Sequence, residues 1–393
     1  MIEGKYFRIP EGPLDIEMLW RRTPPLEPTN LPSWLTPEDS SEYRCVASAS
    51  CAGLSADDQE NYFAEIEQIE YAGLIADPYP NNRHSHRIYL PAKQKNKYDL
   101  WSIGIYCGDS PFHLGPAPGV QNPVLTREHV SDVPAVFVAD PFMVRSGDLW
   151  YMFFEVLNWR TDKGEIGLAT SEDGLAWKYR QIVLAEPFHL SYPHVLRWKN
   201  DYYMIPECCR TGSVRLYKAV EFPLRWSFAG TLLEGPHFVD ASPFRFKGKW
   251  WLFTETNPNE KHDTLRLYHA GDLSGPWVEH PQSPIVEADP RAARPGGRVV
   301  VTGDRIIRYS QDCWPDYGTR VRAFKLMHLT TAGYAESEAE ESPVLSPGGT
   351  GWNAAGMHHI DVHRMAGGRW LACVDGWVKA TEQAASENHA EVA

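Results

Sequence analysis

The chain lacks the features that mark membrane and secreted proteins. No stretch of its 393 residues approaches the roughly 18 consecutive apolar residues that a membrane helix needs. The opening residues, MIEGKYFRIPEGPLDIEM, contain acids where a signal peptide has a basic start and an apolar stretch. The sequence also contains no Asn-x-Ser/Thr sequon. We therefore expect neither membrane insertion nor secretion.

Positive charge and paired cysteines are scarce as well. The net charge is −13, which repels polyanions, so we expect no nucleic-acid partner. The seven cysteines are odd in number and irregularly spaced, and no pair has the CxxC spacing of a zinc or redox site. Reduced thiols are the simplest interpretation, and they predict a cytoplasmic location.

Motifs of several large enzyme classes are missing too. The sequence has no Walker loop, no Rossmann glycine pattern, no HExxH and no GxSxG. Nucleotide hydrolysis, hydride transfer and serine-hydrolase chemistry are therefore unsupported, and we expect no cofactor. What the chain has in quantity is aromatic residues, 12% of the total with 15 Trp and 18 Tyr. Combined with many Gly and Pro turns, they are typical of packed β-sheets and of sugar-stacking surfaces.

An internal repeat predicts the architecture. Residues 138–155, 190–207 and 239–255 each contain a short segment, a tight turn, a pair of bulky aromatics and a final Glu. Weaker copies follow at 293–312 and 357–375, where Gln311 and Asp375 take the place of the Glu. Each copy reads as two strands joined by a hairpin.

The repeat is offset around a circle. A further strand and loop follow each of the first four copies, the fifth copy lacks them, and an orphan second element begins at Ile103 before the first copy. An N-terminal strand that closes the last sheet explains this offset, as in a propeller without exposed edges. We predict an all-β, five-bladed β-propeller over residues 98–378. A β-sandwich is the alternative, but it does not explain the offset.

The two ends of the chain do not fit the repeat. Residues 1–97 carry acid-rich, partly helical patterns at 31–44 and 55–75, with Ser or Asp caps before them. We predict an irregular, partly helical extension that wraps or caps the propeller, with a remnant linker as the alternative. Residues 379–393 are predicted to be a flexible tail.

The innermost strand of every blade starts at one mouth of the central channel, so equivalent starts converge there. These starts carry polar and charged residues, namely Asp140, Tyr192, His194, Asp240, Arg294, Arg298, His358, His359 and Asp361. Carboxylates facing one another across a channel can have pKa values that differ strongly, which supplies the acid and the base of glycosyl transfer. Asp140 and Asp240 could instead cap turns through Asx hydrogen bonds, a structural role.

The remaining candidates are less certain in role. Glu207 and Glu255 end second strands and are candidate acids, although their repetition favours a structural role. Adjacent strand residues point to opposite faces, so only one of His358 and His359 should face the channel. That favours a substrate hydrogen bond over a divalent metal in the channel, which stays the second interpretation. Gln311 and Asp312 join the substrate-binding group, and Trp159 and Trp314 suit a sugar-stacking platform.

The stretch from Trp101 through Gly376 resembles a known family. The resemblance is carried by NPVLT, FVADPF, WYMFFEV, GEIGLATS, EPFHLSYPHV, YYMIPE, SVRLYKA, ARPGGR, YSQDC and GMHHID. These motifs resemble the N-terminal domain of glucosamine inositolphosphorylceramide transferases. That domain is itself similar to the five-bladed propellers of glycoside hydrolase family 43 and its relatives in families 32, 68 and 130.

The resemblance implies that the chain processes or binds carbohydrate. In the hydrolase relatives an aspartate at the first blade start, often followed by Pro, is the base, and Asp140 of ADPF matches it. Asp240 of VDASPF matches a second aspartate, whereas Tyr192-Pro193-His194 departs from the pattern and no Glu stands at a blade start. This departure puts simple hydrolysis in doubt.

Three functional hypotheses follow. The first is a carbohydrate-active enzyme of glycoside-hydrolase type that acts on a glycan or glycoconjugate, with Asp140 as base or nucleophile and Asp240 as its partner carboxylate. Glu207 or Glu255 would be its acid, and the Arg- and His-rich rim could suit an anionic substrate or a phosphate acceptor. The second is a non-catalytic glycan-binding module that serves a partner glycosyltransferase. The third is a small-molecule tailoring enzyme on a reused propeller.

Overall fold

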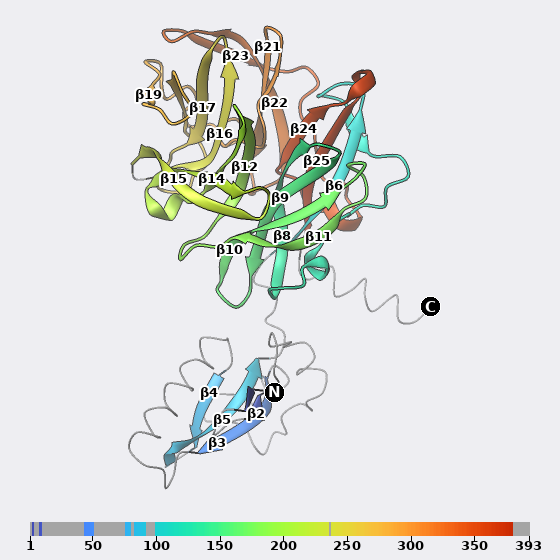
Figure 1. Ribbon diagram of the computed structural model, residues 1–393, viewed down its shortest axis with the longest axis vertical. Coiled ribbons are helices and arrows are strands. Elements are labelled where there is room, and N and C mark those ends of the chain that lie inside the picture. Colours follow the sequence, from blue (N-terminus) through green and yellow to red (C-terminus); the bar gives the residue numbers. More distant parts are fainter. Residues whose placement is uncertain are drawn as a thin grey trace. The chain divides into compact units, whose positions relative to one another are not determined.

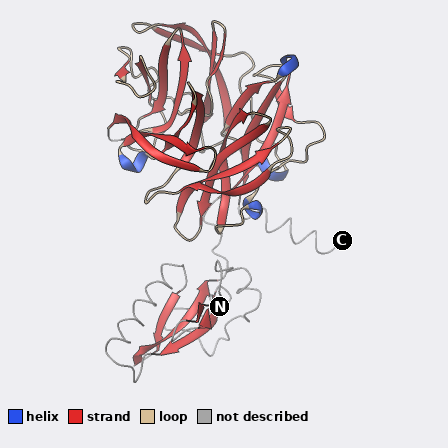
Figure 2. Ribbon diagram, viewed as in Figure 1, coloured by secondary structure: helices blue, strands red, loops and turns tan. Residues whose placement is uncertain are grey.

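The structure is a computed structural model that describes residues 99–235 and 237–379, together with the backbone of five strands nearer the N-terminus. The chain divides into two compact units, of which the second comprises Asp99–Ser131, Ala135–Asn158 and Asp162–Ala393. This second unit is almost entirely β-structure (Figure 2).

Four sheets of the second unit each use four consecutive, antiparallel strands (Figure 1). The first blade contains β8 (Ala135–Ser146), β9 (Leu149–Asn158), β10 (Lys163–Ser171) and β11 (Lys178–Leu184). The second contains β12 (Ser191–Trp198), β13 (Asp201–Glu207), β14 (Ser213–Glu221) and β15 (Arg225–Glu234). The third contains β16 (Val239–Phe246), β17 (Lys249–Glu255), β18 (Leu265–Ala270) and β19 (Val278–Glu279). The fourth contains β20 (Val300–Thr302), β21 (Arg305–Asp312), β22 (Arg320–Leu329) and β23 (Tyr334–Glu338).

The fifth sheet joins the two ends of the propeller. Its strand order is β24-β25-β6-β7, so the hairpin from the end of the chain pairs with the strands that precede the first blade. These strands are β24 (Ile360–Arg364), β25 (Trp370–Val378), β6 (Leu100–Gly108) and β7 (Leu114–Pro116). This closure confirms the predicted five-bladed propeller and rules out the β-sandwich, because a circular permutation of strands is what closes the ring.

Short turns between the first two strands of the blades follow from a few residues. Ser146 pairs with Leu149 across Gly147, and Phe246 pairs with Lys249 across Lys247 and Gly248. Gly147 and Gly248 have φ values of 59° and 79°, which glycine adopts at no steric cost. Short 3₁₀ turns lie in the connecting loops, at Arg127–His129, Cys209–Thr211, Gly351–Asn353 and Ala366–Gly368.

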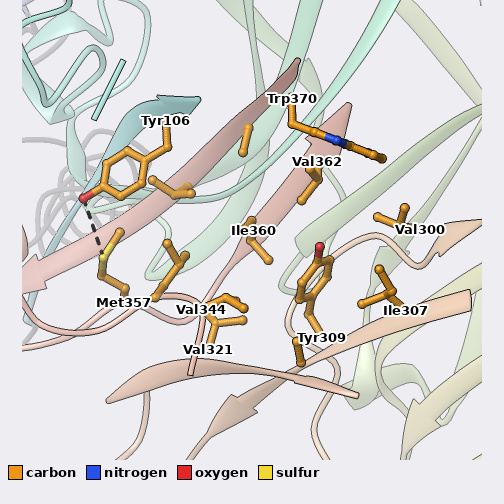
Figure 3. Close-up of a cluster of buried hydrophobic side chains, with 14 of the residues drawn as sticks. Tyr106, Val300, Ile307, Tyr309, Val321, Val344, Met357, Ile360, Val362 and Trp370 are labelled. Carbon is orange, nitrogen blue, oxygen red and sulfur yellow. Dashed lines mark hydrogen bonds between the residues drawn. The ribbon is translucent and has the colours of Figure 1, made fainter. Parts of the chain in front are cut away.

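The hydrophobic core lies between neighbouring blades rather than in one central mass. Figure 3 shows the cluster between the fourth and fifth blades, where Tyr309 and Val321 face Ile360 and Trp370. The same figure shows the hydrogen bond from the Tyr106 hydroxyl to the Met357 sulfur. Similar clusters join the first blade to the second, the second to the third and the third to the fourth. The first and fifth blades meet at a smaller cluster of Trp101, Ala139 and Trp377.

The first unit contains strands that the sequence analysis did not predict. A three-stranded sheet has the order β3-β5-β4, with β3 at Tyr43–Ser50, β4 at Ile75–Tyr79 and β5 at Asn82–Pro91. The strands β1 (Ile2–Glu3) and β2 (Arg8–Ile9) also pair. The helical pattern predicted for 31–44 is therefore wrong where it overlaps β3. The rest of the predicted helical segments, and residues 380–393, lie outside the described residues.

Candidate active site

The inner strands of the first three blades share one irregularity. Pairing is interrupted between Ala139 and Phe142 in β8, between Ser191 and His194 in β12, and between Val239 and Ser242 in β16. At these bulges three non-glycine residues have φ values in the left-handed region, namely Asp140 (53°), Tyr192 (44°) and Asp240 (53°). A bulge redirects a side chain out of the strand's normal alternation. Left-handed non-glycine residues are costly and cluster at functional sites.

The acid that ends each sequence repeat lies beside the bulge of its own blade. Glu155 pairs with Ala139, Glu207 with Ser191 and Glu255 with Val239. In the fourth blade the amide of Gln311 donates to the carbonyl of Arg294. In the fifth, Asp375 accepts hydrogen bonds from the amides of His358 and His359. The blade starts and the repeat-ending residues are therefore neighbours in all five blades.

Asp140 is buried with one free carboxylate oxygen. Its Oδ2 accepts a hydrogen bond from the Tyr192 amide at 3.3 Å, while within the described propeller Oδ1 has no hydrogen-bond partner. Two imidazole nitrogens lie near Oδ1, His359 Nδ1 at 3.6 Å and His358 Nε2 at 3.8 Å. Burial, together with the negative charges of Asp240 and Asp375, raises the pKa of Asp140 well above its usual range.

Asp240 has a similar free oxygen but a cationic partner. Its Oδ2 accepts hydrogen bonds from Arg294 Nε at 2.6 Å and from Gln311 Nε2 at 2.8 Å. Among the described residues, Oδ1 of Asp240 and Oε1 of Gln311 have no partner. Burial raises the pKa of Asp240 to about 6, although Arg294 opposes the rise. Two buried carboxylates thus lie in different electrostatic environments.

A histidine and an aspartate of the fifth blade form a hydrogen-bonded pair. His358 Nδ1 lies 2.9 Å from Asp375 Oδ1, and the other Asp375 oxygen accepts from the amide of Asp140 at 3.0 Å. Burial alone would raise the pKa of Asp375, but His358 lowers it below its usual range. The Trp101 ring stacks on the His358 ring, with centroids 3.9 Å apart. We call Asp140, Asp240, Arg294, His358 and Asp375 the mouth cluster.

A second polar group lies further along the same inner strands. Arg298 Nε donates to Asp361 Oδ1 at 2.6 Å, and its other nitrogens reach the carbonyl of Val195 and His194 Nε2. Asp361 Oδ2 also accepts from the amide of Met143 and lies 2.9 Å from His363 Nε2. Burial would raise the pKa of Asp361, but Arg298 and His363 hold it far below its usual range. We call Asp361, Arg298, His194 and His363 the deep cluster.

Buried aromatic rings separate the two clusters. The Phe142 ring contacts the rings of Tyr192, His194 and His359 at centroid distances of 4.6 to 4.8 Å. Both His358 and His359 approach Asp140, although the sequence analysis expected their side chains to point to opposite faces of a strand. The reason is that β24 begins at Ile360, so the two histidines precede the strand and its alternation does not apply.

The remaining predicted residues separate into three groups. Both oxygens of Glu207 are bonded, to Ser191 Oγ and to the Cys209 amide. In contrast, Glu255 Oε2 has no partner within the described residues and lies 3.6 Å from His237 Nε2. Asp312 is buried and paired with Arg322, and its substrate-binding role stays a prediction.

The two predicted stacking tryptophans belong to different units of the chain. Trp314 is 62% exposed on the loop after β21, a position open to a ligand. Trp159 belongs to the first unit, so its place beside the mouth stays a prediction.

Three residues of this site were missed from the sequence. Asp375 occupies the repeat-ending position of the fifth copy, a signal that could have found it. Tyr317 lies under the Arg294 guanidinium, 4.8 Å from ring centroid to Cζ, and 5.3 Å from the His358 ring. Tyr317 and Trp101 come from outside the repeat-equivalent positions, so no pattern indicates them. A cavity of 430 Å³ lies between the first and fifth blades, and Trp101 forms part of its wall with Trp352 and Arg127.

Asp140, His358 and Asp375 also place one potential metal-ligating atom each within 4.8 Å of one another. Asp375, however, already accepts from the His358 ring and from three backbone amides. A carboxylate whose lone pairs are directed at four donors fits the role of a hydrogen-bond acceptor better than that of a metal ligand.

Comparison with known proteins identifies the family of the chain. Residues 93–377 match the sequence family described as glucosamine inositolphosphorylceramide transferase 1, N-terminal. The chain belongs to this family. A transferase of that name from Oryza sativa subsp. japonica is 38% identical over 299 residues, and one from Arabidopsis thaliana is 36% identical over 349 residues. These alignments cover 70% and 84% of the chain but 40% and 44% of the relatives, so the chain spans less than half of their length.

The solved structures that match the chain are more distant. The family 117 glycoside hydrolase Zg3597 from Zobellia galactanivorans matches 61% of this chain and 84% of its own, with 17% identity and a TM-score of 0.42. The α-L-arabinanase from Cellvibrio cellulosa matches 60% of this chain and 86% of its own, with 18% identity and a TM-score of 0.43. The propeller assignment rests on the sheet topology described above and not on these scores.

Proposed function

We propose that this propeller is a carbohydrate-active enzyme that acts on a glycan or glycoconjugate by glycosyl transfer at the mouth cluster. The observation that carries the proposal is a pair of buried carboxylates, Asp140 and Asp240, at equivalent bulges of two blades. Within the described residues, each has one oxygen without a hydrogen-bond partner. Because buried polar atoms are normally paired, free oxygens on two such groups indicate a place for a ligand that donates hydrogen bonds.

The electrostatics of the two carboxylates support different tasks. Glycosyl transfer needs one group that gives a proton to the leaving oxygen and one anion that faces the positive charge on the sugar. The raised pKa of Asp140 favours its protonated form, and Arg294 beside Asp240 favours the ionised form of that residue above about pH 6. Environments that separate two carboxyl pKa values in this way are typical of acid and base assignments. This distribution differs from the expectation that Asp140 is the base.

The rest of the mouth suits a polar, anionic substrate. Arg294 is held between Asp240 and Tyr317 with 13% of its side chain exposed, and guanidinium groups bind phosphate and carboxylate oxygens. The printed names of the relatives refer to glucosamine and to inositolphosphorylceramide, an amino sugar and a phosphate-bearing lipid. We infer a phosphate-bearing glycoconjugate as the substrate class. The predicted cytoplasmic location is part of the proposal and rests on the cysteines alone.

The test is product formation by the purified full chain. Glycosides, oligosaccharides, sugar phosphates and glycosylated inositol phosphates are incubated with wild type and with the Asp140→Asn variant, and products are detected by mass spectrometry. Asp148→Asn is the matched control, because Asp148 is exposed in the hairpin at the other end of β8. We expect product with wild type and the control, and a loss of roughly 10²–10⁴-fold in Asp140→Asn. Equal turnover by wild type and Asp140→Asn would contradict the proposal.

A second candidate is a glycan-binding module that presents substrate to a glycosyltransferase. It is favoured by the extent of the match, which leaves more than half of each curated relative outside the aligned region. The same panel separates the two candidates when binding is measured by calorimetry alongside turnover. Binding of a panel member without any product would support the module, and Asp240→Asn should then weaken binding rather than turnover.

A further inference from the structure

The fifth blade contributes a histidine whose orientation is fixed by two neighbours, Asp375 and Trp101. Asp375 faces His358 Nδ1 at 2.9 Å and so directs the opposite nitrogen, Nε2, toward the first blade. The stacked Trp101 ring holds the plane of the imidazole, with an angle of 26° between the two rings. His358 and Asp375 are both buried, with 3% and 0% of their surfaces exposed. The pair is therefore preorganised, with one nitrogen of the imidazole left for another partner.

The atom opposite that nitrogen is the free oxygen of Asp140. His358 Nε2 and Asp140 Oδ1 are 3.8 Å apart, which is too long for a hydrogen bond between them. It is short enough for one ligand oxygen to lie about 2.8 Å from both atoms, the usual length of such a bond. In the part of the chain that the structure describes, Asp140 Oδ1 has no other hydrogen-bond partner. The gap between the two side chains is thus suited to a single hydroxyl or glycosidic oxygen.

Apart from its aspartates, the mouth has few side chains that could donate a proton. Glu207 has both oxygens bonded, and Glu155 faces His189 at 3.3 Å. Glu255 keeps one free oxygen but lies beside His237. His358 reaches a carboxylate of another blade and carries its own carboxylate on the far side of its ring.

We propose that His358 is a catalytic acid–base residue of this site and that Asp375 is its positioning residue. The inference rests on the proposed glycosyl transfer and revises one role in it: His358 gives the proton to the leaving oxygen, while Asp140 holds that oxygen. His358 Nε2 exchanges that proton with the substrate oxygen held between it and Asp140.

The step balances with two reactants, the glycosidic substrate and one water or acceptor alcohol. When the bond between the sugar carbon and the leaving oxygen breaks, its electron pair stays on that oxygen, which takes the proton from His358 Nε2. The positive charge that develops on the sugar faces the Asp240 carboxylate. The incoming water or acceptor alcohol then forms the new carbon–oxygen bond, and its proton returns to the neutral imidazole. The enzyme ends in the state in which it began.

Leaving-group dependence tests the role of His358. A glycoside with a good leaving group, such as a nitrophenyl glycoside, needs no proton in the first step, whereas an alkyl glycoside does. We expect His358→Gln to lower kcat on alkyl glycosides by roughly 10²–10⁴-fold and on nitrophenyl glycosides by less than about tenfold. His363→Gln is the matched control, since His363 also lies 2.9 Å from an aspartate but belongs to the deep cluster. The control should lower both rates equally or neither.

Asp375→Asn tests the positioning role. An amide cannot hold the Nδ1–H tautomer as a carboxylate does, so the variant should lose kcat on alkyl glycosides with little change in KM. It should also lose the low-field imidazole N–H resonance that we expect for His358 in the ¹H NMR spectrum of the wild type. A merely structural role would not produce the dependence on leaving group.

The outcomes separate this inference from the proposed function. Wild type that makes no product from any panel member overturns the proposed function and this inference together. Turnover by wild type with the same ratio of alkyl to nitrophenyl rates in His358→Gln overturns the inference alone. An NMR spectrum that places the His358 proton on Nε2, with Nδ1 bare, would also overturn it, whether or not a substrate is known.

Discussion

The mouth cluster and the deep cluster contain the same kinds of residue in opposite states. Each has a buried aspartate that bonds an arginine Nε at 2.6 Å, and each has a histidine 2.9 Å from a carboxylate. In the deep cluster, Asp361 uses both oxygens for bonds. In the mouth cluster, Asp140 and Asp240 each keep one oxygen that no described residue bonds. The pKa of Asp361 is lowered, whereas those of Asp140 and Asp240 are raised.

This difference indicates what each cluster is for. A buried ion pair whose carboxylate oxygens are both bonded, as in Asp361 with Arg298, fixes the structure around it, although His194 Nδ1 has no hydrogen-bond partner among the described residues. A network with free acceptors has a lower stability than its residues could provide, and it gains those bonds when a ligand arrives. The deep cluster therefore holds the inner strands together, and the mouth cluster is the part of the channel available for chemistry. Residue type alone does not separate the two roles.

Asp361→Asn should have the largest effect on folding. The change removes the charge that pairs with Arg298, and breaking a buried pair typically lowers the free energy of unfolding by about 3–5 kcal/mol. The lowered pKa of Asp361 means that this stability is present above the unfolded value of about 3.9 and is lost as the pH falls below it. Guanidinium denaturation at pH 7, followed by tryptophan fluorescence, measures the loss. A loss below about 1 kcal/mol would show that the deep cluster does not contribute more to the free energy of unfolding than the mouth cluster does.

Asp140→Asn should change stability in the opposite direction. A raised carboxyl pKa gives stability that is present below about pH 3.9 and is lost as the pH rises through the folded value, by roughly 1.4 kcal/mol for each unit of the shift. The variant has no such group, so it should be more stable than wild type at pH 8, and the difference should shrink toward pH 4. Thermal unfolding across this pH range is the measurement, with Asp148→Asn as the control. A variant less stable than wild type at pH 8 would contradict the raised pKa of Asp140.

The circular offset of the repeat was enough to predict the ring, because only closure by an N-terminal strand accounts for an orphan element at Ile103. The convergence of the blade starts then followed from the fold. The division into two clusters could not be predicted, since it depends on bulges that shift Asp140 and Asp240 relative to His194. Trp101 and Tyr317 reach the site from outside the repeat-equivalent positions, so the repeat gave no indication of them. The N-terminal strands, such as β3 (Tyr43–Ser50) and β5 (Asn82–Pro91), were missed because they lie outside the repeat on which the fold prediction rested.

The smallest expected effect concerns two glutamates at equivalent places in neighbouring blades. Glu255→Gln removes a charge whose Oε2 has no hydrogen-bond partner among the described residues and lies 3.6 Å from His237 Nε2, so it remains available to a ligand. We expect turnover or ligand affinity to fall by roughly tenfold, the size of one hydrogen bond to a charged group, with little change in stability. Glu207→Gln is the matched control. Both Glu207 oxygens bond Ser191 and Cys209, so its loss should lower the free energy of unfolding by about 1 kcal/mol and leave turnover unchanged. If Glu207→Gln lowered turnover and Glu255→Gln lowered only stability, the glutamate that bonds the ligand would be Glu207 of the second blade and not Glu255 of the third.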